Sequence, residues 1–233
     1  MTGPLLALLF SAAFPGLYFE QTTVLGPGGS AAVPGVRSRV WCAGRRMRLE
    51  AADAAGGPAL VLRLDEGRAI RLDPDTRTAT ELDTSRLRAR AASDAAVAAG
   101  LMGGPGDERL RTSALTAQRR IAGHVCQGYR IAGRSFLVDA WVADDLPVRA
   151  DVFADFLEWS GAAQALGGLV SAIRALPGFP LETRMRVNVF GEVKETVSTI
   201  TLIRVGEPPA DRFVVPEGWR LVDERAEPAG VER

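Results

Sequence analysis

The chain has 233 residues, 47% of them hydrophobic and 24% charged, which is enough to form one globular domain with its own core. Its 28 basic residues balance 28 acidic ones, so no net field favours nucleic acid or an anionic membrane surface as a partner. We therefore expect a monomer without nucleic acid, and nothing in the composition requires a second domain.

The chain begins with a short apolar run. Pro4 to Ala13 has the length of a signal-peptide core, and Ser11-Ala12-Ala13 offers small residues for cleavage. No Lys or Arg precedes the run, so a misplaced start or a buried first element is the alternative. Pro15-Gly16 closes the run before the roughly 20 apolar residues that a membrane span needs. Residues 1–16 are thus interpreted as a signal peptide or an apolar N-terminal segment, and a periplasmic location is predicted.

Short segments with alternating polarity follow and predict strands. Turn signals such as Ala43-Gly44, Asp65-Glu66-Gly67 and Asp73-Pro74-Asp75 separate them, which favours an antiparallel meander. The expected strands cover 17–25, 36–42, 45–50, 60–64, 68–72 and 77–82.

The second part of the chain mixes helices and strands. A helix is expected over 84–100 with Thr84 or Ser85 as its cap, and strands over 109–117, 124–131 and 136–143, of which 124–131 should lie centrally. A hairpin over 181–190 and 193–205 comes next, and then short segments at 213–215 and 219–222. The tail 223–233 is predicted to be disordered.

One long helix is predicted from Asp151 to Leu176, ended by Pro177-Gly178. Its apolar residues recur every three or four positions and form a broad stripe. Gly161, Gly167 and Gly168 either break this helix or allow close packing. An apolar helix facing many short strands predicts an α+β fold, a curved antiparallel sheet wrapped around internal helical structure over 17–222.

Signatures of catalysis are missing from the sequence. We find no nucleophile elbow, phosphate loop, zinc helix or dithiol motif. His124 is the only histidine, and with Cys126 it offers two soft ligands where a metal needs about four, so a solvent-facing histidine is the preferred interpretation. Asp144-Asp145 is typical of a turn. The prediction is a non-enzymatic protein with no metal and no cofactor.

The two cysteines, Cys42 and Cys126, leave two interpretations open. An oxidising compartment would allow them to form a disulfide, and the alternative is two separate buried thiols.

Large apolar side chains are the remaining candidates for function. They either fill the core or line a ligand cavity between sheet and helix. The residues expected to line such a cavity are Trp141, Phe153, Phe156, Leu157, Leu166 and Val170.

Four stretches carry a resemblance to a known family: Gly44 to Glu50, Ile121 to Ile131, Trp141 to Pro147 and Gly178 to Glu182. Together they resemble an uncharacterised bacterial envelope family of the LolA/LolB-like lipoprotein-carrier superfamily. The resemblance implies an unclosed antiparallel half-barrel over internal helices. It also implies binding of a lipid, an acyl chain or a lipoprotein in the space between. Carriers of this type look as though an early-strand arginine holds a lid, and here Arg45, Arg46 and Arg48 compete for that role.

Two functions are therefore expected. The first is a periplasmic binding protein that accommodates an apolar chain between sheet and helix. The alternative is an envelope regulatory or structural module with a filled core, which binds another envelope protein.

Overall fold

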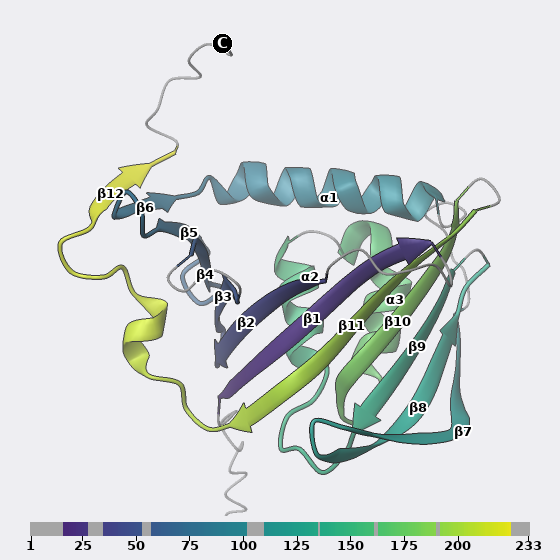
Figure 1. Ribbon diagram of the computed structural model, residues 1–233. Coiled ribbons are helices and arrows are strands. Elements are labelled where there is room, and N and C mark those ends of the chain that lie inside the picture. Colours follow the sequence, from purple (N-terminus) through teal and green to yellow (C-terminus); the bar gives the residue numbers. More distant parts are fainter. Residues whose placement is uncertain are drawn as a thin grey trace, which may run out of the picture.

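The computed structural model describes residues 16–27, 35–52, 57–101, 110–134, 136–160, 163–189 and 192–224. These residues form one sheet with three helices on its inner, concave face (Figure 1). Residues 1–15 of the predicted signal segment lie outside the described residues, as do positions 225–233 of the predicted tail. No helix in the described ranges has the length and apolarity to cross a membrane.

Twelve strands make up the sheet in the order β12-β6-β5-β4-β3-β2-β1-β11-β10-β9-β8-β7. Neighbouring strands are antiparallel except for β12, which runs parallel to β6. The strands are β1 (Leu17–Pro27), β2 (Val36–Ala43), β3 (Arg46–Ala51), β4 (Ala59–Arg63), β5 (Arg68–Asp73), β6 (Thr78–Glu81), β7 (Arg111–Ile121), β8 (His124–Ala132), β9 (Phe136–Ala143), β10 (Phe179–Val189), β11 (Glu192–Val205) and β12 (Arg220–Asp223).

The sheet is open, because β12 and β7 lie at opposite ends of the order and do not pair with each other. It curves around helices α2 (Asp151–Ser160) and α3 (Ala163–Arg174), which pack against one another. The predicted α+β half-barrel around internal helices is thereby confirmed.

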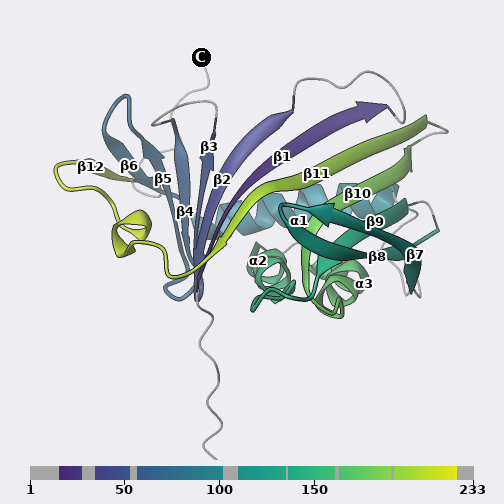
Figure 2. The same ribbon diagram turned by 60° about the horizontal axis from the view of Figure 1, so that its bottom comes forward.

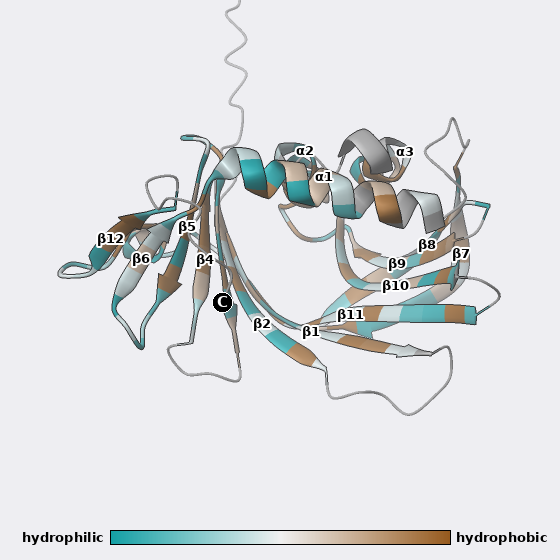
Figure 3. Cartoon of the chain, turned by 90° about the horizontal axis from the view of Figure 1, so that it is seen from above, coloured by the Kyte–Doolittle hydropathy of each residue, from teal (hydrophilic) through white to brown (hydrophobic). Residues whose placement is uncertain are grey.

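Helix α1 (Thr84–Leu101) runs across the concave side from the end of β6 toward the strands at the other end of the sheet (Figure 3). It packs on α3 and α2. Its cap is Asp83, whose carboxylate accepts the backbone N–H groups of Ser85 and Arg86, so the predicted cap at Thr84 or Ser85 was wrong by one or two residues.

Two expectations about the second half of the chain are decided by the structure. The helical run expected over 151–176, whose glycines were expected either to break it or to allow close packing, is two helices, α2 and α3. Strand β8 is next to the edge of the sheet, because only β7 lies beyond it. Alternating polarity reports a half-buried strand and does not report how many neighbours it has.

The C-terminal segment crosses the outer face of the sheet over β2 to β6, on the side away from α2 and α3 (Figure 2). A short 3₁₀ helix, η1 (Ala210–Phe213), places Phe213 against Trp41 and Val61, where its side chain is 1% exposed. The predicted extended segment 213–215 therefore begins inside a helical turn. Asp223, expected in the tail, ends β12.

Candidate functional site

A largely apolar cavity of about 280 Å³ lies between the inner face of the sheet and helices α2 and α3. Its described lining comes from β1, β8, β9, β10 and β11 on one side and from the helices and the turn after α3 on the other. Among the described residues no charged side chain lines it. The lining residues are Gln21, Ile131, Val138, Ala140, Phe153, Leu169, Ile173, Leu176, Pro180, Leu181, Thr183, Met185, Ser198 and Ile200.

Phe153, which lines the cavity, belongs to a cluster of three aromatic rings. Phe153 on α2 stacks on Phe179 at the start of β10, with ring centroids 5.2 Å apart and an interplanar angle of 27°. Phe19 on β1 meets both rings edge-on at about 6 Å. Offset and edge-to-face contacts of this kind stabilise aromatic pairs beyond their burial. The cluster therefore holds α2 against the sheet at the cavity wall.

Helix α3 lines the cavity on the side that faces the sheet, next to α2. Leu169 and Ile173 are one helical turn apart and so share a face, which packs on Ile131, Val138 and Met185 of the sheet. On β9 the inward side chains alternate with outward ones, which places Val138 and Ala140 toward the helix. The walls on both sides are thus aliphatic.

One region of the cavity is polar and uncharged. The amide nitrogen of Gln21 donates to the Thr23 hydroxyl at 3.0 Å, and the Thr23 and Ser198 hydroxyls lie 3.0 Å apart. Thr183 pairs with Ser198 across β10 and β11. The lining therefore changes from aromatic and aliphatic to hydroxyl and amide along the inner face, an arrangement that suits an apolar chain with a polar end.

Phe153 is the predicted ligand residue that lines the cavity. Phe156 and Leu157 are half-buried on α2, and Val170 is buried on α3, but none of these three lines it. The backbone of Leu166 lies in α3, and its side chain is outside the described residues. Trp141 is 4% exposed and packs in a core cluster with Cys126 and Phe179.

The strand residues of the lining were missed at the sequence level. Their signal was present on β9, where alternating side chains include Val138 and Ala140 on one face. Trp141 was predicted to line the cavity because its side chain is large, but it lies on the face of β9 opposite Val138 and Ala140. The guanidinium of Arg119 lies 3.8 Å from the centre of the Trp141 ring and covers it.

None of the three candidate lid arginines lines the cavity. The Arg48 guanidinium pairs with Glu50 and donates to the Arg212 carbonyl. Arg46 lies over the Phe213 ring on the outer face, and Arg45 lines a separate pocket beside the N-terminus of α2. Their positions give no support to a lid contact at this cavity.

His124 and Cys126 make separate contacts in the structure. The Nδ1 atom of His124 lies 2.8 Å from a carboxylate oxygen of Asp145, while the Cys126 thiol is directed at the His124 carbonyl. Within the described ranges no three His, Cys, Asp or Glu residues gather as metal ligands. The pair is part of the contact between β8 and the loop after β9.

Cys42 and Cys126 are both buried free thiols of the same core cluster, so the disulfide offered by the sequence is not formed in this structure. Burial raises the pKa of Cys42 to about 12 and that of Cys126 to about 11. Both side chains are therefore protonated and poorly nucleophilic at neutral pH.

Comparisons with known proteins give matches by structure. No family model matches the chain, and no curated protein matches its sequence. Among solved structures, an uncharacterised conserved protein from Thermus thermophilus is similar over 90% of this chain and 91% of its own, with 10% identity and a TM-score of 0.45. MucB is similar over 90% of this chain at 15% identity and a TM-score of 0.46, and the match spans 61% of the MucB chain.

A LolA superfamily protein from Nitrosomonas europaea is also similar, over 86% of this chain and 90% of its own, with 12% identity and a TM-score of 0.34. At these identities the likeness says nothing of function.

Proposed function

We propose that this protein is a non-enzymatic periplasmic binding protein that holds one apolar chain, such as the acyl chain of a lipid or lipoprotein, between the sheet and helices α2 and α3. The observation that supports this most directly is the uncharged cavity of about 280 Å³ bounded by Phe153, Ile173 and Met185. Empty cavities of about 150 Å³ with such walls stay dry and take small apolar guests.

The lining also gives the bound chain a direction. Its apolar end would lie against Phe153 and the α3 side chains, and its polar end would lie near Thr183, Ser198 and Gln21. Hydroxyl and amide groups can hydrogen-bond a neutral ester or a protonated acid without a buried charge, whose desolvation would be costly. We therefore favour an ester-linked or neutral end group over a free carboxylate.

The volume restricts what fits. Ligand sites for drug-sized molecules begin at about 300 Å³, so a cavity of this volume suits one short or partly inserted chain. A longer chain requires α1, whose described side chains are half-buried or exposed, or α2 and α3 to move away from the sheet.

The first test is extraction of the protein purified from its own cell envelope with organic solvent, followed by mass spectrometry. We expect lipid at a fixed molar ratio to protein. The second test is titration of delipidated protein with a fluorescent fatty-acid ester. Thr183→Phe, which places a ring in the cavity, should weaken this binding at least tenfold.

The matched control is Ser113→Phe on the exposed edge strand β7, opposite Arg130 on the face away from the cavity, which should leave the affinity unchanged. Circular dichroism verifies that both variants are folded. If no lipid is extracted and the ester binds neither protein, the apolar-chain proposal is wrong, and the alternative of a protein-interaction module with a filled core gains support.

A further inference from the structure

A second pocket lies on the outer face of the sheet, where the proposed acyl chain does not reach. Its volume is about 430 Å³, and it is bounded by Tyr18, Trp41, Arg204, Arg212 and the loop 206–209. Tyr18 lies between Leu17 and Phe19, which are both in the inner core, so the Tyr18 ring points to the opposite side. The two cavities are therefore separated by the sheet.

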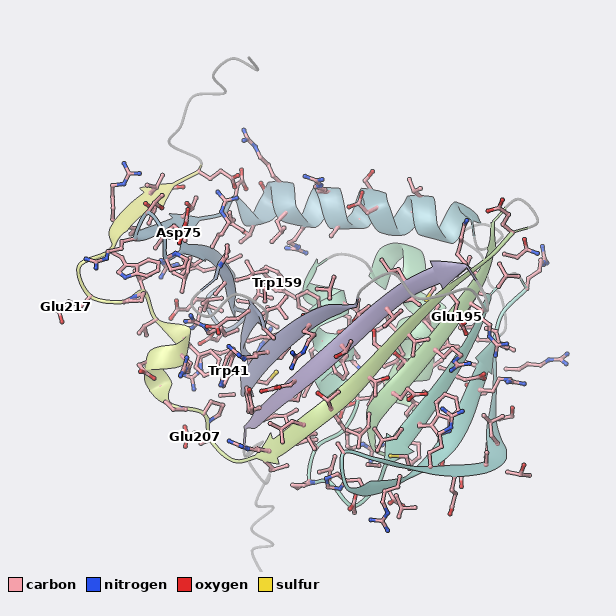
Figure 4. The ribbon with its side chains drawn as sticks, in the orientation of Figure 1. Trp41, Asp75, Trp159, Glu195, Glu207 and Glu217 are labelled. Atoms are coloured by element: carbon pink, nitrogen blue, oxygen red, sulfur yellow. The ribbon has the colours of Figure 1, made fainter. Side chains whose placement is uncertain are left out.

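The floor of this outer pocket is a row of side chains across adjacent strands. The strand register places Arg204 of β11 opposite Tyr18 of β1, and Tyr18 opposite Trp41 of β2. The Tyr18 and Trp41 ring centroids are 5.0 Å apart. Trp41 is 8% exposed and Tyr18 is half-buried, so the floor is partly closed to water. Figure 4 labels Trp41 and Glu207 close to η1.

Two guanidinium groups stand on this aromatic floor. The Arg212 guanidinium lies 5.1 Å from the Trp41 ring centre, and the Arg204 guanidinium lies 6.0 Å from that of Tyr18. A guanidinium stacked on a ring keeps its N–H donors at its edges, where they remain available to an anion. The Arg212 carbonyl also accepts a hydrogen bond of 3.0 Å from Arg48, which ties η1 to β3. This hydrogen bond therefore holds the backbone of Arg212 in place on the sheet.

Among the described residues no acidic side chain pairs with either arginine. In the described parts of the chain neither Arg204 nor Arg212 forms a salt bridge, and both residues are exposed. The carboxylate of Glu20 accepts a hydrogen bond of 2.7 Å from the Tyr18 hydroxyl. Glu207 lines the pocket and is exposed, and it leaves the lining with one net positive charge.

We infer that this outer pocket binds a phosphate group, either free or in the headgroup of a phospholipid. A tetrahedral phosphate offers acceptors to two planar guanidinium forks at once, which a single carboxylate does less well. The aromatic floor lowers the hydration of the arginines on one side and so strengthens such contacts. The lipid source would bring the protein to a membrane surface through a face that does not contain the apolar cavity.

The test follows the Trp41 indole N–H signal by NMR in the full chain, assigned with Trp41→Phe, while inorganic phosphate is added at constant ionic strength. A saturable shift is expected. The double variant Arg204→Gln/Arg212→Gln should lose at least tenfold in phosphate affinity. Arg111→Gln, which removes an exposed arginine from β7, should bind as the parent does. All three substituted side chains are exposed, so folding should be preserved.

Vesicles separate the two sources. Co-sedimentation with phosphatidylglycerol vesicles that is lost in the double variant assigns the site to a lipid headgroup. A phosphate response without vesicle binding assigns it to free phosphate. The inference is overturned if the parent shows no saturable response to either, if acetate shifts the signal as strongly as phosphate, or if the double variant binds like the parent. Thr183→Phe should keep the phosphate response, so failure here and failure at the inner cavity are distinguishable.

Discussion

The carboxylate of Asp139 accepts two hydrogen bonds from the guanidinium of Arg130, at 2.6 and 2.9 Å, and a third of 2.7 Å from Arg186. Asp139 lies on β9 and its side chain is 5% exposed, whereas the two arginine side chains are 40% and 36% exposed. The buried carboxylate of β9 therefore links three neighbouring strands on the outer face, because Arg130 is on β8 and Arg186 is on β10.

Asp139→Asn should destabilise the fold by roughly 2 kcal/mol in urea unfolding at pH 7, because it removes the negative charge that both arginines share and replaces one of the two accepting oxygens with an NH2 donor. The hydrogen bond with Arg130 holds the pKa of Asp139 below its ordinary value. The ionised Asp139 carboxylate contributes its full stabilisation of the folded state above a pH of about 4, the ordinary pKa of an aspartate, and this contribution is lost as the pH falls through the lower pKa of the folded state. The difference between parent and variant should shrink below about pH 4.

Glu192→Gln is the control for this substitution, since its pair with Lys194 is exposed and should contribute nothing measurable. The role given to Asp139 would be contradicted if Asp139→Asn and Glu192→Gln lowered the free energy of unfolding equally. It would also be contradicted if the difference between the parent and Asp139→Asn stayed unchanged down to pH 2.

Phe153→Ala should lower the free energy of unfolding by about 2 kcal/mol, because it removes the stack on Phe179 from a half-buried position and enlarges the cavity. Phe156→Ala on the same helix removes an equally large side chain that does not line the cavity, and we expect a smaller loss. Urea titrations of both variants provide the comparison. A larger loss for Phe156→Ala would show that Phe153 does not hold α2 on the sheet.

Gly178→Ala should be strongly destabilising, by about 2 kcal/mol or more. A Cβ atom at this position would lie 2.1 Å from the carbonyl oxygen of Ala143, so the backbone between α3 and β10 would have to shift. The Gly178 carbonyl also accepts the N–H of Ala150 just before α2. The shift would therefore reach both ends of the helical pair.

Gly100→Ala is the matched control, because the added methyl group meets nothing within 4 Å and the position is in helix α1. It should stabilise the protein by up to about 1 kcal/mol. Thermal unfolding followed by circular dichroism measures both variants, and a tolerated Gly178→Ala would refute the close approach to Ala143.

The thiols give a prediction about reactivity. Because burial raises the pKa of Cys42 to about 12 and of Cys126 to about 11, alkylation of the folded protein at pH 8 should be slow for both. In denaturant without reductant, two thiols per chain should react rapidly. Finding none under those conditions would establish the disulfide that the sequence left open.

Periodicity predicted most of the strands and the helical regions, since each covers several residues of one pattern. It left open whether the helix beginning at Asp151 is divided, because Gly161, Gly167 and Gly168 are compatible either with a break or with close packing. The position of β8 beside the edge and the parallel pairing of β12 depend on contacts between distant segments. A single sequence does not carry that information in any local pattern.

A cavity between sheet and helix was one of two alternatives that the sequence left open, and most of its lining residues were not identified. Phe153 was identified by size and helical spacing. The small and medium-sized lining residues, such as Ala140 and Thr183, look ordinary in sequence, and they become cavity residues only because their neighbours leave space. The outer pocket was not foreseen, since Arg204 and Arg212 reach Tyr18 and Trp41 only after the C-terminal segment crosses the sheet.

The pairing of β1 with β11 joins the first strand described to one that begins some 165 positions later, and it lies in the middle of the sheet order. On the β1 side of this pair lie β2 to β6, from the first part of the chain, together with β12. On the β11 side lie β7 to β10, which come later in the sequence. Most of the polypeptide must therefore be present before the two halves can join, which makes assembly slow and dependent on distant encounters. During that interval the edges of β1 and β11 stay unpaired, and an exported chain would need protection from aggregation until they meet.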